Sequence, residues 1–167
     1  MPKNYDHSID SMEEKFLLAV DAGIKTGLAL YDHHVNLCWY RSHNMGSLTS
    51  LKRASYNILR STQNLAYLVI EGGGPITEAW IKEAKKLNIT VIQTDAGKWR
   101  PNLLYNREQR SGIKAKQTAI IMAQRIISQS CSKSKNTPTH DAAEAILIGL
   151  WGCMQTGWLQ KLPDLHG

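Results

Sequence analysis

Several features that would place a chain in a specialised class of protein are scarce in this sequence. It has three cysteines in 167 residues, and an odd, scattered set argues against both a disulfide framework and a cysteine-based zinc site. No stretch approaches the roughly 18 consecutive apolar residues of a membrane-spanning helix. Acids are spread through the first fifteen residues, so we expect no secretory signal or transit peptide there. These absences predict a cytoplasmic protein in a reducing compartment, with no membrane partner.

Acidic residues are also few relative to basic ones. The chain has 14 Asp and Glu against 20 Lys and Arg, which gives a formal net charge of +6. Such an excess favours a polyanionic partner. The length suits one domain with a hydrophobic core rather than two. We expect a flexible N-terminal arm at 1–14, a domain at 15–154 and a C-terminal tail at 155–167.

The first part of the predicted domain has the pattern of an antiparallel sheet. An apolar run at 16–20 is followed by turn residues at 21–23. The strand pattern returns at 26–31 and, after a second turn, at 35–40. Two tight connections in succession indicate an antiparallel meander of three strands.

After residue 47 the spacing of the hydrophobic residues changes, and helix patterns alternate with strand patterns. We predict helices at 47–60, 76–87, 114–128 and from about 139, with strands at 67–70 and 89–94. A strand, helix and strand in succession favour parallel pairing through a right-handed crossover. Residues 95–112 show no period and are predicted to be irregular. The predicted fold class is α/β, with a mixed five-stranded sheet of three antiparallel strands and then parallel strands, flanked by helices.

Four acids stand at the ends of these apolar elements. Asp21 ends the first strand, Glu71 ends the fourth, and Asp141 and Glu144 open the last helix. In an open α/β sheet the ends of adjacent strands lie side by side, and sites collect there. A spacing of three residues puts the two helical acids one turn apart on the same face. We therefore expect the four carboxylates to converge.

Carboxylates that converge repel one another and raise each other's pKa values unless a cation holds them. Oxygen ligands without cysteine or clustered histidine favour Mg²⁺, with Mn²⁺ as a substitute, over zinc. Two such ions can activate a water and stabilise the leaving oxygen of a phosphodiester. This chemistry needs acids from separate elements that converge, and the chain offers them.

Each acid also has a purely structural interpretation. Asp21 with Gly23 makes an ordinary turn. Asp141 and Glu144 have the spacing of a capping arrangement at a helix start. The glycines at 72–74 are compatible with a flexible turn after Glu71. Both interpretations stay open for each acid taken singly, and the coincidence of all four favours a site.

Cations gather around two aromatic residues, Trp99 and Tyr105, in the segment after the last predicted strand. They are Lys98, Arg100, Arg107, Arg110, Lys114 and Lys116. Cations neutralise phosphates and aromatic rings stack on exposed bases, so we predict a nucleic-acid-binding segment. The alternative is a solvated loop that the aromatics anchor to the core. The packing interpretation applies to Trp99 in particular, and we leave this residue out of the predicted site without assigning it a role.

Taken in order, these motifs resemble the RuvC-type Holliday-junction resolvases, a family of the ribonuclease H-like superfamily. The resemblance runs from Phe16 to Gly152 and covers most of the chain. Four motifs carry it: Asp21-Ala22-Gly23 followed by Thr26-Gly27, then Glu71, then Gly112 to Gln117, and finally His140 to Ala145.

The resemblance implies a ribonuclease H-like fold and a homodimeric, Mg²⁺-dependent endodeoxyribonuclease. Such an enzyme cuts four-way DNA junctions symmetrically, with two ions in each active site. Asp21 would bridge both ions. Glu71 would hold one of them, and Asp141 and Glu144 would hold the other. Lys116 would support the negative charge that develops at the scissile phosphate.

The chain also departs from the family pattern. Ala22 stands where a proline is usual, Glu144 where an aspartate is usual, and glycines follow Glu71 where the family often has an aromatic residue. The loop from Asp21 to Lys25 is similar to that of the YqgF family, which shares the fold and acts on RNA precursors. Three hypotheses follow: a junction resolvase, an RNA-processing nuclease, and a non-catalytic nucleic-acid-binding module.

Overall fold

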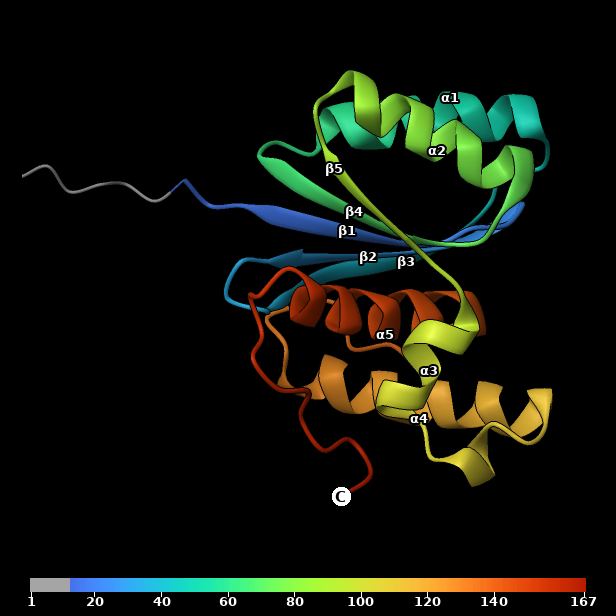
Figure 1. The fold of residues 1–167 in the computed structure, drawn as a ribbon, viewed down its shortest axis with the longest axis vertical. Coiled ribbons are helices and arrows are strands. Elements are labelled where there is room, and N and C mark those ends of the chain that lie inside the picture. The colour runs from blue at the N-terminus through green and yellow to red at the C-terminus, as the bar shows by residue number, and fades with distance from the viewer. Residues whose placement is uncertain (1–12) are drawn as a thin grey trace, which may run out of the picture.

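A five-stranded sheet separates two groups of helices (Figure 1). The computed structural model describes residues 13–167, so residues 1–12 of the predicted arm lie outside the described residues. In sheet order the strands are β3 (Leu37–Asn44), β2 (Lys25–Asp32), β1 (Phe16–Asp21), β4 (Leu65–Glu71) and β5 (Thr90–Thr94). The first three strands of the chain pair antiparallel, and β4 pairs parallel with both β1 and β5. The predicted mixed α/β sheet is confirmed.

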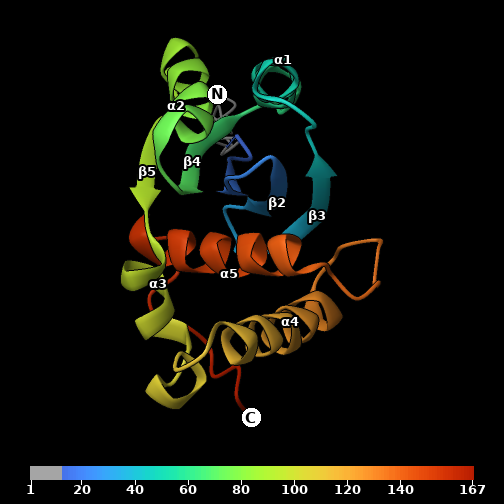
Figure 2. The same ribbon diagram turned by 90° about the vertical axis from the view of Figure 1, so that its right-hand side faces the viewer.

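The helices lie in separate groups on the two faces of this sheet. α1 (Leu48–Ser61) and α2 (Gly74–Lys86) cover one face, and α5 (His140–Gln155) covers the other (Figure 1). α4 (Gly112–Gln129) packs on the outer side of α5, and α3 (Ala96–Leu103) links β5 to this group (Figure 2). The ends of the four predicted helices differ by at most two residues from those observed. Across residues 13–167, none of the helices combines the length and the apolar character needed to cross a membrane.

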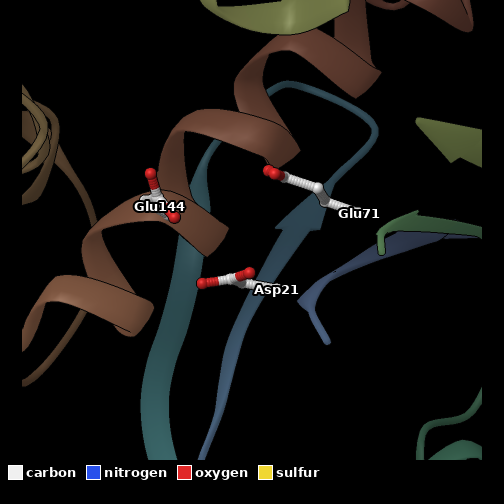
Figure 3. Close-up of side chains that lie close together, drawn as sticks. All are labelled: Asp21, Glu71 and Glu144. Carbon is white, nitrogen blue, oxygen red and sulfur yellow. The ribbon is translucent and has the colours of Figure 1, made fainter. Parts of the chain in front are cut away.

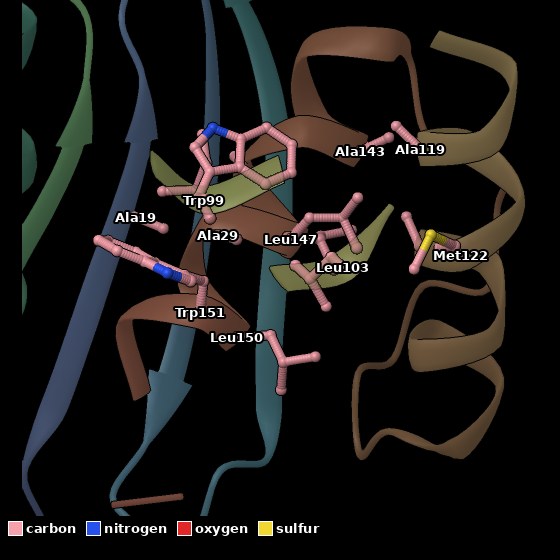
Figure 4. Close-up of a cluster of buried hydrophobic side chains, with 14 of the residues drawn as sticks. Ala19, Ala29, Trp99, Leu103, Ala119, Met122, Ala143, Leu147, Leu150 and Trp151 are labelled. Carbon is pink, nitrogen blue, oxygen red and sulfur yellow. The ribbon is translucent and has the colours of Figure 1, made fainter. Parts of the chain in front are cut away.

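The central strands are buried on both faces, which explains their unbroken apolar runs. In β1, Leu17 and Ala19 belong to the cluster under α5, and Leu18 and Val20 belong to the cluster under α1 and α2. This alternation follows from the two-residue period of a strand. Figure 4 shows part of the first cluster, where small residues let α5 approach the sheet.

Three glycines let α5 lie directly on the strands. A Cβ atom added at Gly149 would fall 2.4 Å from the ring of Tyr31, and one at Gly152 would fall 2.6 Å from the side chain of Val69. At Gly27 in β2 the added atom would fall 1.9 Å from the backbone oxygen of Asp141. The first turn of α5 is therefore held against one end of the sheet.

Residues 95–112 differ from the prediction, because they contain α3 and a 3₁₀ turn at Asn106–Glu108. The side chain of Asp95 caps α3 by accepting a hydrogen bond from the backbone N–H of Lys98 at 3.1 Å. Trp99 and Leu103, one turn apart, are the buried residues of this helix. A helix of eight residues makes only about two turns, which is too few to show a period in the sequence.

The segment predicted as a C-terminal tail folds back on the domain. Leu165 is buried, and the side chain of Arg125 donates to its backbone oxygen. The ring of His166 stacks on Tyr105, and its Nε2 lies 2.8 Å from the backbone oxygen of Leu103. The last residues therefore contact the start of the predicted nucleic-acid-binding segment.

The Gly27→Ala variant tests the contact between β2 and α5. Overpacking of this kind costs about 1–3 kcal/mol, and each kcal/mol shifts the Tm of a chain of this size by about 2–4 °C. Thermal unfolding should therefore show a lower Tm for Gly27→Ala than for the wild type. Gly112→Ala is the matched control, because apart from its chain neighbours and the backbone of its own helix no atom lies within 4 Å of the added methyl group. Equal Tm values for the two variants would contradict the contact.

Candidate metal centre

Two carboxylates lie at neighbouring strand ends. Asp21 and Glu71 are the last residues of β1 and β4, and they face each other in the parallel register. Residues opposite each other on adjacent strands point to the same face of a sheet. Figure 2 looks onto this end of the molecule, where β1 and β4 finish and α5 crosses the sheet.

Glu144 of α5 joins these two acids. Asp21, Glu71 and Glu144 each offer a carboxylate oxygen, and these oxygens all lie within 4.8 Å of one another. Figure 3 shows the three carboxylates around one space between the strand ends and α5. Glu144 is buried, and the other two acids are half-buried. Three of the four acids that the sequence analysis singled out are therefore brought together from three separate elements.

Asp141, the fourth acid, is held by other partners. Its carboxylate accepts hydrogen bonds from the hydroxyls of Ser42 and Thr139, and the Lys25 ammonium lies 3.6 Å away. Burial raises the pKa of Asp141, but the hydrogen bond from Ser42 and the charge of Lys25 outweigh it and leave the pKa below its ordinary value. Among the described residues, Asp141 does not belong to the group of acids whose carboxylate oxygens lie within 4.8 Å of one another.

Two of the three convergent acids, Asp21 and Glu71, carry their negative charge at a cost. Burial, followed by repulsion from Glu144, Glu71 and Asp141, raises the pKa of Asp21 to about 8. Burial also raises the pKa of Glu71, against the lowering effect of its hydrogen bond with Trp99. Carboxylates in this condition are stabilised by a proton or a cation.

α3 supplies two of the neighbours of this cluster. The indole Nε1 of Trp99 donates to Oε2 of Glu71 at 2.5 Å, and the guanidinium of Arg100 donates to Oε1 of Glu144. His140 Nε2 lies 3.5 Å from that same glutamate oxygen. Arg100 was predicted to bind nucleic acid, and it forms an ion pair inside the cluster.

Two contacts at this end of the sheet were absent from the sequence analysis. Trp99, which was left out of the predicted site, is buried and also bonds Glu71. The contact of Ser42 with Asp141 follows from register, because Ser42 pairs with Gly27 and Gly27 pairs with Asp21. Counting residues from the second hairpin would not have found this pairing, because the register of β2 and β3 shifts between Leu30 and Tyr31. No sequence signal points to the contact of Trp99 with Glu71.

The other predicted nucleic-acid-binding cations are spread over α3, the 3₁₀ turn and the start of α4. Lys98 lies 3.7 Å from Asp95, and Arg107 lies over the ring of the half-exposed Tyr105 at 5.2 Å. The remaining members are exposed: Arg110, Lys114 and Lys116. Within residues 13–167, no ion pair joins Lys116 to an acid. Its role and that of the segment stay predictions.

The sheet order and the helices on its two faces define a ribonuclease H-like fold. Comparison with solved structures supports this class. The chain is similar to RuvC of T. thermophilus in complex with a Holliday junction substrate, with a TM-score of 0.60 and 13% sequence identity over 86% of this chain and 96% of that one.

It is also similar to the yeast mitochondrial Holliday junction resolvase Ydc2, with a TM-score of 0.56 and 11% identity over 86% of this chain and 81% of that one. At these identities the likeness shows the fold alone, and the predicted ribonuclease H-like fold is confirmed. The sequence itself matches no protein-family model and no curated protein.

The donors at the site fit a hard divalent cation. The three convergent groups are all carboxylates, as Mg²⁺ and Mn²⁺ prefer. Burial and repulsion together raise the pKa of Asp21, and such an ion would favour its ionised form. The residues present therefore fit the metal that the sequence predicts.

The raised pKa of Asp21 predicts how the stability of the metal-free protein depends on pH. Its ordinary value is 3.8 and its folded-state value is about 8, so between these values the folded state binds more protons than the unfolded state. The contribution of Asp21 to the free energy of unfolding therefore falls as pH rises through this interval. In EDTA at pH 8, Asp21→Asn should unfold at a higher temperature than the wild type.

Added Mn²⁺ should raise the Tm of the wild type and raise that of Asp21→Asn much less, because a ligand of the folded state stabilises it. The exposed Glu78 provides a control, since Glu78→Gln should leave both the pH dependence and the Mn²⁺ effect unchanged. An Asp21→Asn variant that is no more stable than the wild type at pH 8 in EDTA would contradict the repulsion.

Proposed function

We propose that this protein is a structure-selective endonuclease that hydrolyses phosphodiester bonds in four-way DNA junctions with the help of Mg²⁺. The observation that carries the proposal is the convergence of three carboxylates at one sheet end. They converge in a fold similar to those of two Holliday junction proteins.

In this proposal Asp21, Glu71 and Glu144 would hold the first Mg²⁺. Bound ions would supply an activated water and stabilise the leaving oxygen of the phosphodiester. A second ion would need a further ligand, and Asp141 is the acid nearest in sequence, one turn before Glu144. Its carboxylate would have to exchange its bonds with Ser42 and Lys25 for one with the ion.

Basic residues near the carboxylates would then offset negative charge on the cluster and on the DNA. Arg100 neutralises part of the negative cluster through Glu144. Lys116 would support the charge that develops on the scissile phosphate. The basic segment would bind flanking phosphates, and neutralising six of them would make affinity fall by orders of magnitude as salt is added.

A four-way junction has two equivalent strands to cut. We propose a homodimer, because two identical subunits related by a two-fold axis can each cut one of these strands. Symmetric incisions would be the sign of this arrangement.

Cleavage assays with labelled substrates test the proposal. The full chain would be incubated with a four-way DNA junction, duplex DNA and structured RNA, each with Mg²⁺, Mn²⁺ or EDTA. We expect paired nicks in the junction that EDTA abolishes. Cleavage of RNA alone would replace the proposal with RNA processing. Salt-sensitive junction binding without cleavage in either ion would identify a non-catalytic binding module.

The Asp21→Asn variant separates binding from cleavage. Junction affinity, measured by gel shift in Ca²⁺ or EDTA, should stay at or above that of the wild type, because a negative charge has been removed. Cleavage should fall to the level seen in EDTA, because the ion loses a ligand. Retained cleavage would rule out a metal-binding role for Asp21.

Lys116→Ala tests the predicted role of this lysine in charge stabilisation. We expect the single-turnover cleavage rate to fall by about 10²–10³-fold, the usual cost of removing one transition-state donor, with a smaller loss of junction affinity. Lys82→Ala, which changes an exposed lysine on α2, is the matched control and should leave both quantities unchanged. A larger loss of affinity than of rate would reassign Lys116 to phosphate binding.

A further inference from the structure

Trp99 connects the hydrophobic core to the candidate metal centre. Its side chain is fully buried among residues of β1, β2 and α5 (Figure 4). An indole N–H can only donate a hydrogen bond, and that of Trp99 donates to Oε2 of Glu71 at 2.5 Å. One residue thus packs in the core and bonds a carboxylate of the cluster.

The topology explains how α3 reaches this carboxylate. Glu71 pairs with Thr94 at the ends of β4 and β5, and α3 begins two residues after Thr94. The cap from Asp95 fixes the start of α3 beside Glu71. Leu103 is buried one turn after Trp99, so the helix is anchored at two points on its inner face.

A second buried tryptophan shows that this bond does not follow from burial. Trp80 in α2 is also fully buried, in the cluster on the other face of the sheet. Its Nε1 has no hydrogen-bond partner. The core therefore holds a buried indole without an acceptor for its N–H group, and Trp99 differs from Trp80 by pairing with one of the three convergent acids.

The bond restrains a side chain that its neighbours repel. Glu71 lies close to the carboxylates of Asp21 and Glu144, and a glutamate has enough rotamer freedom to turn away from them. A hydrogen bond to one carboxylate oxygen holds the group in place and leaves the other oxygen for an ion. Partners of this kind orient metal ligands, and their loss commonly weakens metal affinity by about 10–100-fold.

We infer that Trp99 is a positioning residue, whose indole N–H holds Glu71 in the orientation that binds the divalent ion. The inference rests on the proposed function, because it concerns the same ion site. It assigns to α3 a part in building the site in addition to its place in the core.

Mn²⁺ binding to the full chain, measured by titration calorimetry without DNA, tests the inference. Trp99→Phe keeps an aromatic ring and removes the N–H group, so it should weaken Mn²⁺ binding by about 10–100-fold. Trp80→Phe is the matched control and should keep the wild-type affinity at a comparable loss of Tm. Adding Trp99→Phe to Glu71→Gln should weaken binding no further, because the residue acts through Glu71.

The inference would be overturned if Trp99→Phe bound Mn²⁺ as tightly as the wild type, or if Trp80→Phe lost as much Mn²⁺ affinity as Trp99→Phe. In either case, junction cleavage by the wild type would leave the proposed function standing. A wild type that neither binds Mn²⁺ nor cuts junctions would overturn both.

A second measurement needs no metal and uses Trp99→Phe only to assign one signal. The chain has five tryptophans, and their indole N–H groups give separate nuclear magnetic resonance signals. The signal absent in Trp99→Phe identifies Trp99. In Glu71→Gln this signal should move more than the other four, and a signal that stays in place would overturn the inference.

Discussion

The repulsion among three half-buried or buried carboxylates is the constraint to which the rest of the site responds. Left in solution, these groups would separate, and the fold prevents it by fixing their backbones. Asp21 and Glu71 are joined by the strand register, and Glu144 is delivered by a helix whose first turn touches Gly27. Burial and then repulsion from the neighbouring acids raise the pKa of Asp21, so its ionised form is unfavourable here without a cation. The acids therefore lower the stability of the folded protein at this site, and a bound divalent ion would restore it.

α3 moderates this repulsion from the side. Trp99 bonds one acid of the cluster and Arg100 pairs with another. The two residues are consecutive, yet one is fully buried and the other is partly exposed. Asp141 has an arrangement of its own, in which Ser42 and Lys25 lower its pKa. Each carboxylate near the sheet end therefore has a distinct environment, as is usual where acids take different roles.

The fold was largely predictable from the sequence, because buried strands and long helices leave clear periods. The meeting of Asp21 and Glu71 was also predictable, since both end apolar strands that a crossover connection makes neighbours. The place of Asp141 was not predictable in the same way. Its spacing from Glu144 gives a shared helix face but not the competition from Ser42, which depends on the register of two hairpins. α3 is too short to show a period, and its contact with Glu71 depends on tertiary packing.

The glycine contacts beneath α5 also determine how the site responds to local fluctuations. Close approach of α5 to Tyr31, to Val69 and to the backbone of β2 at Gly27 leaves the helix little room to slide or roll, and a shift by one residue would turn Glu144 by about 100°. Sites on surface loops open independently of the core. Here the amides of α5 from Ala143 onward, which are hydrogen-bonded within the helix, should exchange with solvent as slowly as those of β1 if the carboxylate cluster and the hydrophobic core open as one cooperative unit.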